Sequence, residues 1–285
     1  MAKTREIRRR IRSIRNTMQL TRAMKMVSAA KLRRAQERIV RARPYARQMQ
    51  EVLRSLASRA NPEAHPLLRV RGDRRAEVLV VSADKGLCGS FNTNIHKTAA
   101  GFVDSLVGRE LSLYTVGKKA RDYFRRRRYP VRQDRVDVFR ELDYPVAAEI
   151  AQDLMQRYCD EELDAVYLVY NEFKSAIQQR PVVERLLPIE PTQLGPGEVA
   201  EDYIYEPEPA TLFATLLPRY VEVCVYRAML ESNAAEQAAR MTAMESATNN
   251  AGDLIHALTL HMNRVRQASI TTEIIEVVSG AEALG

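Results

Sequence analysis

The sequence predicts an α/β protein in which a long antiparallel coiled coil of the N- and C-terminal helices carries an inserted α/β domain. Apolar residues recur with heptad spacing at both ends of the 285-residue chain, and β-rich runs alternate with helical runs between them. Connectors rich in Pro, Gly and charged residues separate these parts. We therefore expect a first coiled-coil helix in residues 1–60, an α/β domain with linkers in 61–209, and a second coiled-coil helix in 210–285 that pairs with the first.

The first segment reads as one helix from an N-cap at Thr4 to about Ala60. Apolar or small residues recur at alternating steps of four and three, which is the spacing of a helix–helix seam. The apolar character of this seam weakens only at Thr21, Lys25 and Ser28. The seam residues are Ile7, Ile11, Ile14, Met18, Thr21, Lys25, Ser28, Leu32, Ala35, Ile39, Ala42, Ala46, Met49, Leu53 and Leu56.

The middle segment changes from helical to strand periodicity after Ala76. Its β-rich runs and helical runs alternate, which indicates a small α/β domain with a largely parallel sheet. The expected strands are residues 77–84, 110–117, 164–173 and 181–190, and the expected helices are about 91–107, 118–126 and 146–160.

The last segment reads as a helix from residue 210 to Ser279, with Gly280 as its C-terminal stop. Pro218 should kink the helix or restart it within the first turns. The segment carries its own heptad seam. The seam residues are Phe213, Leu216, Tyr220, Val223, Arg227, Leu230, Ala234, Gln237, Met241, Met244, Thr248, Ala251, Ile255, Leu258, Met262 and Val265.

The stretch RMTAMESATNNAGDL, residues 240–254, is the weakest helix former within this long helix. If the two helices start flush at the α/β domain, paired residue numbers sum to about 267, which places Met24 near Met241–Met244. The polar seam residues of the first helix then face the weak stretch of the last. Small residues let the helices approach closely, and methionine fills the remaining gaps. This pattern favours a slim waist that another protein grips, although ordinary coiled-coil variation is the alternative.

The same register leaves about 15–20 C-terminal residues without a partner helix. Within this overhang, aliphatic and small side chains form one helical stripe. A lone amphipathic helix must bury such a stripe elsewhere, so a second protein should supply the socket. The stripe residues are Ile270, Ile274, Val277, Val278 and Ala281.

Positive charge is concentrated in the first helix. The whole chain has a net charge of +8, but residues 1–60 alone hold 18 basic and 3 acidic residues, a net of +15. Such an arm suits a polyanion, which could be an acidic protein surface or nucleic acid. A nucleic-acid-binding protein with a basic coiled-coil arm is therefore the alternative function at this point.

Other classes are disfavoured. The sequence has no apolar run long enough to span a bilayer and no apolar region behind the basic N-terminus, so neither a transmembrane segment nor a secretory signal is expected. An organelle transit peptide fits poorly, since the helical pattern continues. Three scattered cysteines fit a reducing compartment, and the four histidines show no metal-ligand spacing.

Two motifs could bind anions. SADKGLCGSFN (82–92) follows a strand and opens a helix, but it matches neither GxxxxGK[ST] nor GxGxxG, so a structural turn is favoured over a nucleotide site. RRRRY (125–129) could grip lipid headgroups or nucleic acid, but a solvated basic face is favoured. We expect no cofactor, no metal and no catalytic residues, which argues against a stand-alone nucleotide-binding enzyme.

Four motifs together resemble the gamma subunit of rotary F-type ATP synthase, and the resemblance covers essentially the whole chain. They are TRAMKMVSAAKL (21–32), SADKGLCGSFN (82–92), AARMTAMESATNNAG (238–252) and ITTEIIEVVSGAEA (270–283). The resemblance implies a bacterial-type central rotor stalk with a Rossmann-like α/β domain and no redox insertion. Pro218 departs from the basic residue expected there, which puts the straightness of that turn in doubt.

The resemblance also implies partners and site residues. One copy of the chain would reach into a hexamer of alpha and beta subunits, bind an epsilon subunit, and stand on a ring of membrane c subunits. It would be a non-catalytic subunit, peripheral to the membrane at the cytoplasmic face of the bacterial plasma membrane. Acidic beta-subunit loops would press on the basic shaft. Matched positions give beta-subunit contacts at Met24, Lys25, Arg240, Gln267, Thr271 and Glu273, c-ring contacts at Tyr203, Tyr205 and Glu206, and a bearing tip at Ile270, Ile274, Val277 and Val278.

Overall fold

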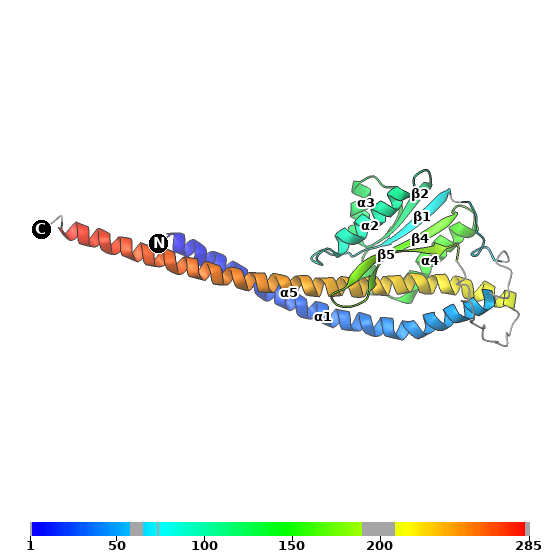
Figure 1. Cartoon of the computed structure of the whole chain (residues 1–285), viewed down its shortest axis with the longest axis horizontal. Helices are drawn as coiled ribbons and strands as arrows, with labels where there is room; N and C mark the ends of the chain where they lie inside the picture. The colour runs from blue at the N-terminus through cyan, green and yellow to red at the C-terminus, as the bar shows by residue number, and fades with distance from the viewer. Residues whose placement is uncertain (1, 58–64, 73, 190–208, 283–285) are drawn as a thin grey trace, which may run out of the picture. The chain divides into compact units, whose positions relative to one another are not determined.

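A computed structural model of the chain describes residues 2–57, 65–72, 74–189 and 209–282 (Figure 1). The chain forms two compact units. The helical unit comprises Met1–Ser28 and Arg240–Gly285, and the α/β unit comprises Ala29–Ala239. Each long terminal helix contributes to both units, so the two units do not coincide with the three segments expected from the sequence. The boundaries of those three segments stay predictions.

The two terminal helices are α1, Ala2–Ala57, and α5, Pro209–Glu282. The residues predicted to begin α1 and to end α5 do not do so. Helix α1 begins before Thr4, and α5 continues through Gly280. The N-cap and stop predictions are therefore wrong, because a single weak residue costs only about 1 kcal/mol in a helix. Pro218 also lies within one uninterrupted helix.

The seam residues whose side chains the structure describes are buried or half-buried in both helices. The side chains of the seam residues Ala46, Leu53, Leu56 and Phe213 lie outside the described residues. In α1 the seam residues Ile7, Ile11, Leu32, Ala35 and Ile39 are all less than a tenth exposed. Residues on the opposite face of α1 are exposed, as expected for two helices that share one narrow contact stripe. The buried seam residues of α5 are Val223, Leu230, Ala234, Gln237, Met244 and Ala251.

The α/β unit contains a five-stranded sheet with the order β3-β2-β1-β4-β5. Strands β1 to β4 are parallel, and β5 pairs antiparallel with β4. The sequence prediction missed β3, because its five residues, VRQDR, carry one apolar side chain and show no apolar run. The bounds are Arg75–Val81 for β1, Glu110–Val116 for β2, Val131–Arg135 for β3, Ala165–Phe173 for β4 and Gln179–Leu187 for β5.

Helices cover both faces of the sheet. Helices α2 (Phe91–Ser105) and α3 (Lys118–Arg126) lie on one face, and α4 (Tyr144–Cys159) lies on the other (Figure 1). A short 3-10 helix, Val138–Arg140, precedes α4. The predicted α/β fold class is therefore confirmed. The core between the sheet and α2 and α3 consists of Val78, Val80, Ile95, Ala99, Val103, Leu113, Ala120, Phe124 and Val169.

Candidate functional site on the terminal helix pair

A pair of threonines marks the weak part of the coiled coil in the helical unit. The hydroxyl oxygens of Thr21 and Thr248 lie 2.8 Å apart and share a hydrogen bond across the seam. The Thr21 hydroxyl also lies 3.0 Å from the carbonyl oxygen of Met18, and that of Thr248 lies 2.7 Å from the carbonyl oxygen of Met244. Each hydroxyl is therefore satisfied inside the seam, which makes this polar layer tolerable where apolar residues are expected.

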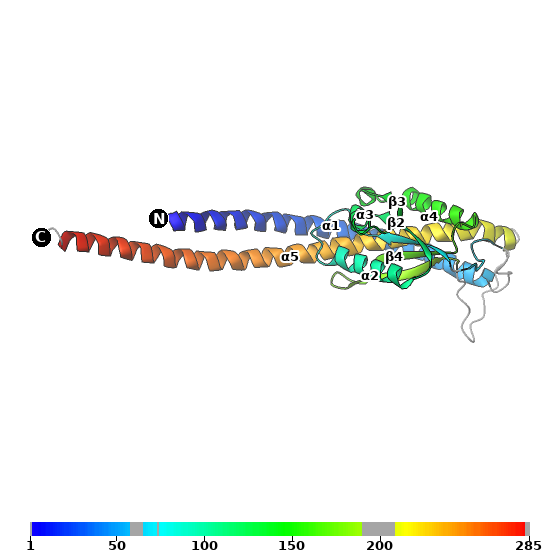
Figure 2. The same cartoon turned by 90° about the horizontal axis from the view of Figure 1, so that it is seen from above.

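The helices of this unit run side by side in opposite directions (Figure 2). One turn from the threonine pair, Lys25 Nζ lies 2.5 Å from Glu245 Oε1. The two contacts give residue-number sums of 269 and 270. The antiparallel prediction is confirmed, and its register of about 267 is wrong by less than one helical turn, since the flush start was an assumption. Met24 therefore lies at the level of residues 245–246 rather than Met241–Met244.

Small side chains fill the seam in this part of the coiled coil. Ser28 is 2% exposed, and Ala251 and Met244 are similarly buried, so small side chains and one flexible thioether fill the seam. Small residues permit a close approach of the two helices, and methionine adapts to irregular space. These burials show which side chains fill the seam, and the slim waist stays a prediction. That another protein grips it stays a prediction.

Large apolar side chains lie on the outer surface of the same segment, and sequence reasoning did not single them out. They fall outside the heptad seam, so the seam pattern leaves them facing outward. These exposed residues are Leu20, Met26, Val27, Leu254 and Leu260.

The six predicted beta-subunit contacts form two groups. Met24 and Lys25 are half-buried beside the seam, and Arg240, which is 9% exposed, begins the α5 part of the helical unit. Gln267, Thr271 and Glu273 are instead exposed near the end of α5. The Thr271 hydroxyl donates to the carbonyl oxygen of Gln267 at 3.0 Å. The structure therefore does not gather all six at one place.

The C-terminal end of α5 extends beyond the start of α1 (Figures 1 and 2). From the observed register, α1 reaches only to about residue 268 of α5. Every residue from 271 to 279 is exposed. The predicted stripe residues Ile270, Ile274, Val277 and Val278 are 48%, 58%, 72% and 51% exposed. Ile275, which was not predicted, is 58% exposed and widens the apolar surface.

In the α/β unit, side chains of the loop 82–92, whose sequence resembles a phosphate-binding turn, form hydrogen bonds with backbone groups of the same unit. Asp84 Oδ1 accepts from the backbone N–H groups of Lys118 and Asp137 at 3.0 and 2.9 Å. Ser82 Oγ accepts from the N–H of Ala120 at 2.8 Å. Asp84 and Ser82 therefore position the first turn of α3 and the residue before the 3-10 helix Val138–Arg140, which is a structural role.

Helix α5 occupies the crevice where ligands bind in sheets of this topology. Ligands bind at the carboxyl ends of the strands where the strand order reverses, which here lies between β1 and β4. Ser232 of α5 reaches the carbonyl oxygen of Val81 at 3.5 Å, and Ala235 packs with Ala83, Cys88 and Phe91. The loop 82–92 therefore packs against α5, in agreement with the interpretation of this motif as a structural turn.

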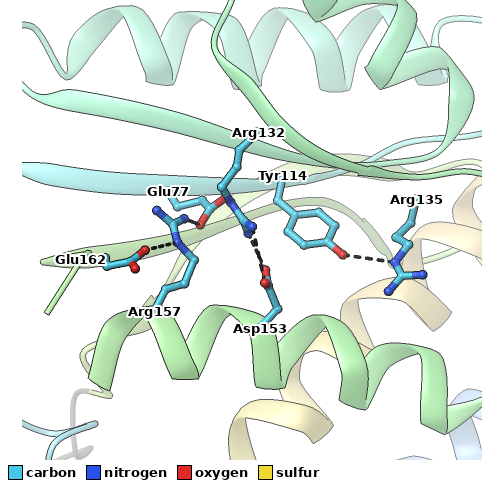
Figure 3. A network of polar contacts seen from close by, with 7 residues as sticks. All are labelled: Glu77, Tyr114, Arg132, Arg135, Asp153, Arg157 and Glu162. Atoms are coloured by element: carbon cyan, nitrogen blue, oxygen red, sulfur yellow. Dashed lines mark hydrogen bonds and ion pairs between the residues drawn. The ribbon is translucent and has the colours of Figure 1, made fainter. Parts of the chain in front are cut away.

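A charge network on the α4 side of the sheet was missed by sequence reasoning (Figure 3). Glu77, fully buried in β1, accepts from Arg132 Nε at 2.7 Å and from Arg157. Asp153 also pairs with Arg132, and Glu162 lies 2.7 Å from Arg157. Burial opposes the charge of Arg132, but the hydrogen bonds that Arg132 donates to Asp153 and Glu77 raise its pKa. Each charge has a partner, so the network ties β1, β3 and α4 together.

The basic run Arg125–Arg128 lies at the end of α3 and is exposed. Arg125 pairs with Asp134, and the guanidinium of Arg127 lies 3.8 Å from the centre of the Tyr123 ring. These contacts agree with a solvated basic face. Among the described residues no cluster of three or more His, Cys, Asp or Glu side chains could hold a metal ion.

Comparisons with known proteins agree on one family. A family model described as ATP synthase matches residues 3–284. The chain is 51% identical over 290 residues to an ATP synthase gamma chain of Anaeromyxobacter sp. (strain Fw109-5), and the alignment covers 100% of both. It is 52% identical to that of Solibacter usitatus (strain Ellin6076), with 98% of each covered. The chain belongs to the ATP synthase gamma chain family.

Solved structures of ATP synthases share the fold of this gamma chain family member. The central stalk and c-ring structure of the Tetrahymena thermophila mitochondrial ATP synthase contains a chain with a TM-score of 0.61 and 27% identity, covering 80% of this chain and 99% of that one. A chain of the Euglena gracilis mitochondrial ATP synthase gives a TM-score of 0.73 at 21% identity, covering 99% and 95%. The resemblance inferred from four motifs is confirmed. The nucleic-acid-binding alternative gains no support from these matches.

Two further expectations for this gamma chain concern the membrane. The predicted c-ring contacts Tyr203, Tyr205 and Glu206 lie outside the described residues. No helix in the described parts of the chain is long and apolar enough to cross a bilayer.

Proposed function

We propose that the chain is the central rotor stalk of an F-type ATP synthase. It couples proton flow through the membrane ring of c subunits to ATP synthesis or hydrolysis in the alpha/beta hexamer, and it does so by rotation. In this role the chain transmits torque and is not itself catalytic. Membership of the gamma chain family and the likeness to a central stalk support this role.

The observation that carries the mechanism is the exposed end of α5. Ile270, Ile274 and Val278 stand on a helix that has no partner from α1 at this level. A rotating shaft needs a bearing that holds it in place without bonds of fixed direction. Hydrophobic burial is non-directional, so an aliphatic surface in an apolar socket allows the shaft to turn.

The segment around Thr21 and Thr248 supplies the second contact region. Met24, Lys25 and Arg240 there, and Gln267, Thr271 and Glu273 nearer the tip, would meet the beta subunits. Basic residues on the outer face of α1 attract acidic loops of the hexamer. Attraction between exposed charges is weak per pair and screened by salt, so it guides contact without locking rotation.

The remaining partners follow from the same role. An epsilon subunit and the c ring would bind the α/β unit, with Tyr203, Tyr205 and Glu206 at the ring. One chain would serve each complex, peripheral to the cytoplasmic face of the bacterial plasma membrane.

A rotation assay tests the proposal, and the chain offers a natural handle. Cys159 at the end of α4 is exposed, whereas Cys88 and Cys224 are buried. We would assemble the chain with bacterial alpha and beta subunits, fix the hexamer to a surface, and attach a biotinylated bead through Cys159. ATP should drive unidirectional rotation of the bead. Cys159→Ser is the control that should carry no bead.

An assembled complex in which ATP is hydrolysed but the labelled chain never turns would overturn the rotor role. Retention of the chain on immobilised DNA, without assembly with alpha and beta, would favour the nucleic-acid alternative.

A further inference from the structure

Helix α5 is held to the rest of the α/β unit from two sides. It lies alongside α4 and strand β5, and polar side chains of α5 reach each of them (Figure 1). Apolar contacts, such as that of Ala235 with Phe91, have no fixed direction and would let the helix roll about its own axis. The polar contacts are therefore the ones that can fix the angle of α5 within this unit.

Glu222 makes the contact with α4. The residue is 3% exposed, and both of its carboxylate oxygens accept hydrogen bonds. Oε2 accepts from the Tyr144 hydroxyl at 2.6 Å, and Oε1 accepts from Gln152 Nε2 at 3.1 Å, so both bonds link α4 to α5. Arg219 of α5 also donates to Oε2 at 3.1 Å and balances the charge. A buried carboxylate with these donors is held in one geometry.

Arg227 makes the contact with β5. Its Nη2 lies 2.9 Å from both carboxylate oxygens of Glu184. Burial opposes the charge of the guanidinium, but the attraction of Glu184 and further neighbouring groups raises the pKa of Arg227. Tyr170 of β4 donates a hydrogen bond to the same carboxylate at 3.2 Å. The contact therefore joins α5 to two strands of the sheet through charge-assisted hydrogen bonds.

Glu222 and Arg227 project from different sides of α5. Five residues correspond to about 500° of helical rotation, so the two side chains leave the helix about 140° apart. Rolling α5 in either direction moves both side chains together, and each is bonded to a different element. Such a roll must stretch or break hydrogen bonds to a charged group, which opposes it in both directions.

We propose that the contacts of Glu222 with α4 and of Arg227 with β5 form a torque clamp that prevents α5 from rolling within the α/β unit. The inference rests on the rotor role proposed above. Helix α5 is continuous from the α/β unit into the helical unit, so torque on the shaft passes along it. The torque clamp passes this torque to α4 and the sheet, and the α/β unit then turns with the helix. Glu222 and Arg227 are positioning residues in this role.

The test compares two beads in the rotation assay, one carried by α4 and one carried by α5. The full-length chain is assembled with alpha and beta subunits, and the hexamer is fixed to a surface. The α4 bead is attached through Cys159 and Gln156→Cys, two exposed positions. The α5 bead is attached through Thr211→Cys and Thr215→Cys, also exposed, in a chain with Cys159→Ser. Two attachment points about one helical turn apart prevent each bead from swivelling.

The readout is the angular variance of each bead during the pauses between rotation steps at low ATP. Glu222→Leu removes the contact with α4, and Arg227→Met removes the contact with β5. Two comparable charge-assisted contacts share the restraint, so losing either should raise the variance of the α4 bead roughly twofold. The α5 bead should not change, because α5 itself carries the torque to it. Arg180→Met, which removes an exposed ion pair with Glu172 inside the sheet, is the matched control and should change neither bead.

Two results overturn the torque clamp. One is a wild-type variance of the α4 bead in both Glu222→Leu and Arg227→Met. The other is an equal increase for both beads, since the looseness would then lie between the shaft and the hexamer. Wild-type beads that never turn would overturn the rotor role and the torque clamp with it, whereas turning beads with unchanged variance overturn the torque clamp alone.

Circular dichroism checks that each variant is folded. If Glu222→Leu is not, Glu222→Gln takes its place, because the amide keeps an acceptor for Tyr144 but loses the charge that attracts Arg219. The α4 bead should then show a smaller increase in variance than in Arg227→Met. No increase in Glu222→Gln and Arg227→Met would overturn the torque clamp.

Discussion

Thr21 and Thr248, 227 positions apart in sequence, share a 2.8 Å hydrogen bond across the seam of the terminal helices. A coiled coil gains more stability from aliphatic seam residues than from hydroxyl pairs. A single buried polar layer fixes register, since any shift would leave both hydroxyls facing apolar partners. The pair therefore gives up some stability and in return fixes one alignment of the two helices.

Replacing the threonines by valine tests this exchange. Thr21→Val and Thr248→Val should each cost about 1 kcal/mol, whereas the double variant should be close to neutral or stabilising, because both polar partners are then removed together. Urea unfolding followed by circular dichroism measures the difference. Thr17→Val, on the exposed face of the same helix, is the control and should change stability by less than about 0.5 kcal/mol. Additive single effects in the double variant would show that the two hydroxyls are not coupled.

The coiled coil was predictable because its signal is periodic. Heptad spacing identified the seam residues, and the assumption that the two helices start flush at the α/β domain gave a register within one turn of the observed one. The polar strand β3 and the network around Glu77 carry no such period. Their side chains are explained only by partners from distant parts of the chain, such as Arg132 and Arg157.

Glu77 should be the most sensitive charge in the α/β unit. Glu77→Gln leaves Arg132 and Arg157 beside an uncharged amide at a fully buried position, and breaking a buried ion pair costs about 3 kcal/mol or more. Thermal unfolding of the full-length chain measures the loss. Glu149→Gln removes an exposed carboxylate that pairs with Arg135 and should cost less than about 1 kcal/mol. Equal effects of the two variants would contradict the role assigned to the network.

Gly117 occupies a position that no other residue fits. Its φ is +96°, and an added Cβ would lie 2.3 Å from the carbonyl oxygen of Ser82. Gly117→Ala should therefore destabilise the α/β unit by about 3 kcal/mol or more, from backbone strain and the clash together. Gly108→Ala, at φ +85° in open space, carries the strain alone and should cost about 1 kcal/mol. Chemical denaturation measures both losses of stability. A larger loss in Gly108→Ala than in Gly117→Ala would exclude the clash at Gly117.

His96 should make stability depend on pH. Burial, with further contributions from Arg127 and Lys119, lowers its pKa from 6.5 to about 4. The unfolded chain therefore binds a proton at higher pH than the folded chain does. This contribution to stability is fully present above pH 6.5, falls by at most about 1.4 kcal/mol per pH unit as pH drops, and levels off near pH 4.

The measurement compares unfolding free energies of the wild type and His96→Phe at pH 7 and pH 4.5. Phenylalanine keeps the ring stacked on Tyr123, whose centroid lies 4.5 Å away, but it cannot bind a proton. The wild type should lose more stability than the variant over this range. Identical losses would show that His96 is not the group that titrates.

Part of the α/β unit could not be read from the sequence because it depends on tertiary packing. The motif SADKGLCGSFN is ambiguous by itself, and only the position of Ser232 and Ala235 shows that α5 fills the crevice.

The end of α5 allows the most direct test of the rotor proposal. Ile274 is 58% exposed on a helix that has no partner from α1 at this level. Ile274→Asp should therefore leave the free chain as stable as the wild type, because the side chain contributes little to its own fold. In complex with the alpha/beta hexamer, the aspartate would be placed in an apolar socket, and burying an unpaired charge is costly.

We expect Ile274→Asp to weaken assembly with alpha and beta subunits at least about tenfold, the equivalent of losing about 1.4 kcal/mol. Sizing chromatography over a range of subunit concentrations measures the affinity. Ile177→Asp is the matched control, because Ile177 is 91% exposed and belongs to the α/β unit rather than the helical unit. Unfolding of the free Ile274→Asp chain with normal assembly would show that the stripe is internal packing. Loss of assembly in both aspartate variants would show a nonspecific charge effect. Only selective loss in Ile274→Asp supports a bearing built on this aliphatic surface.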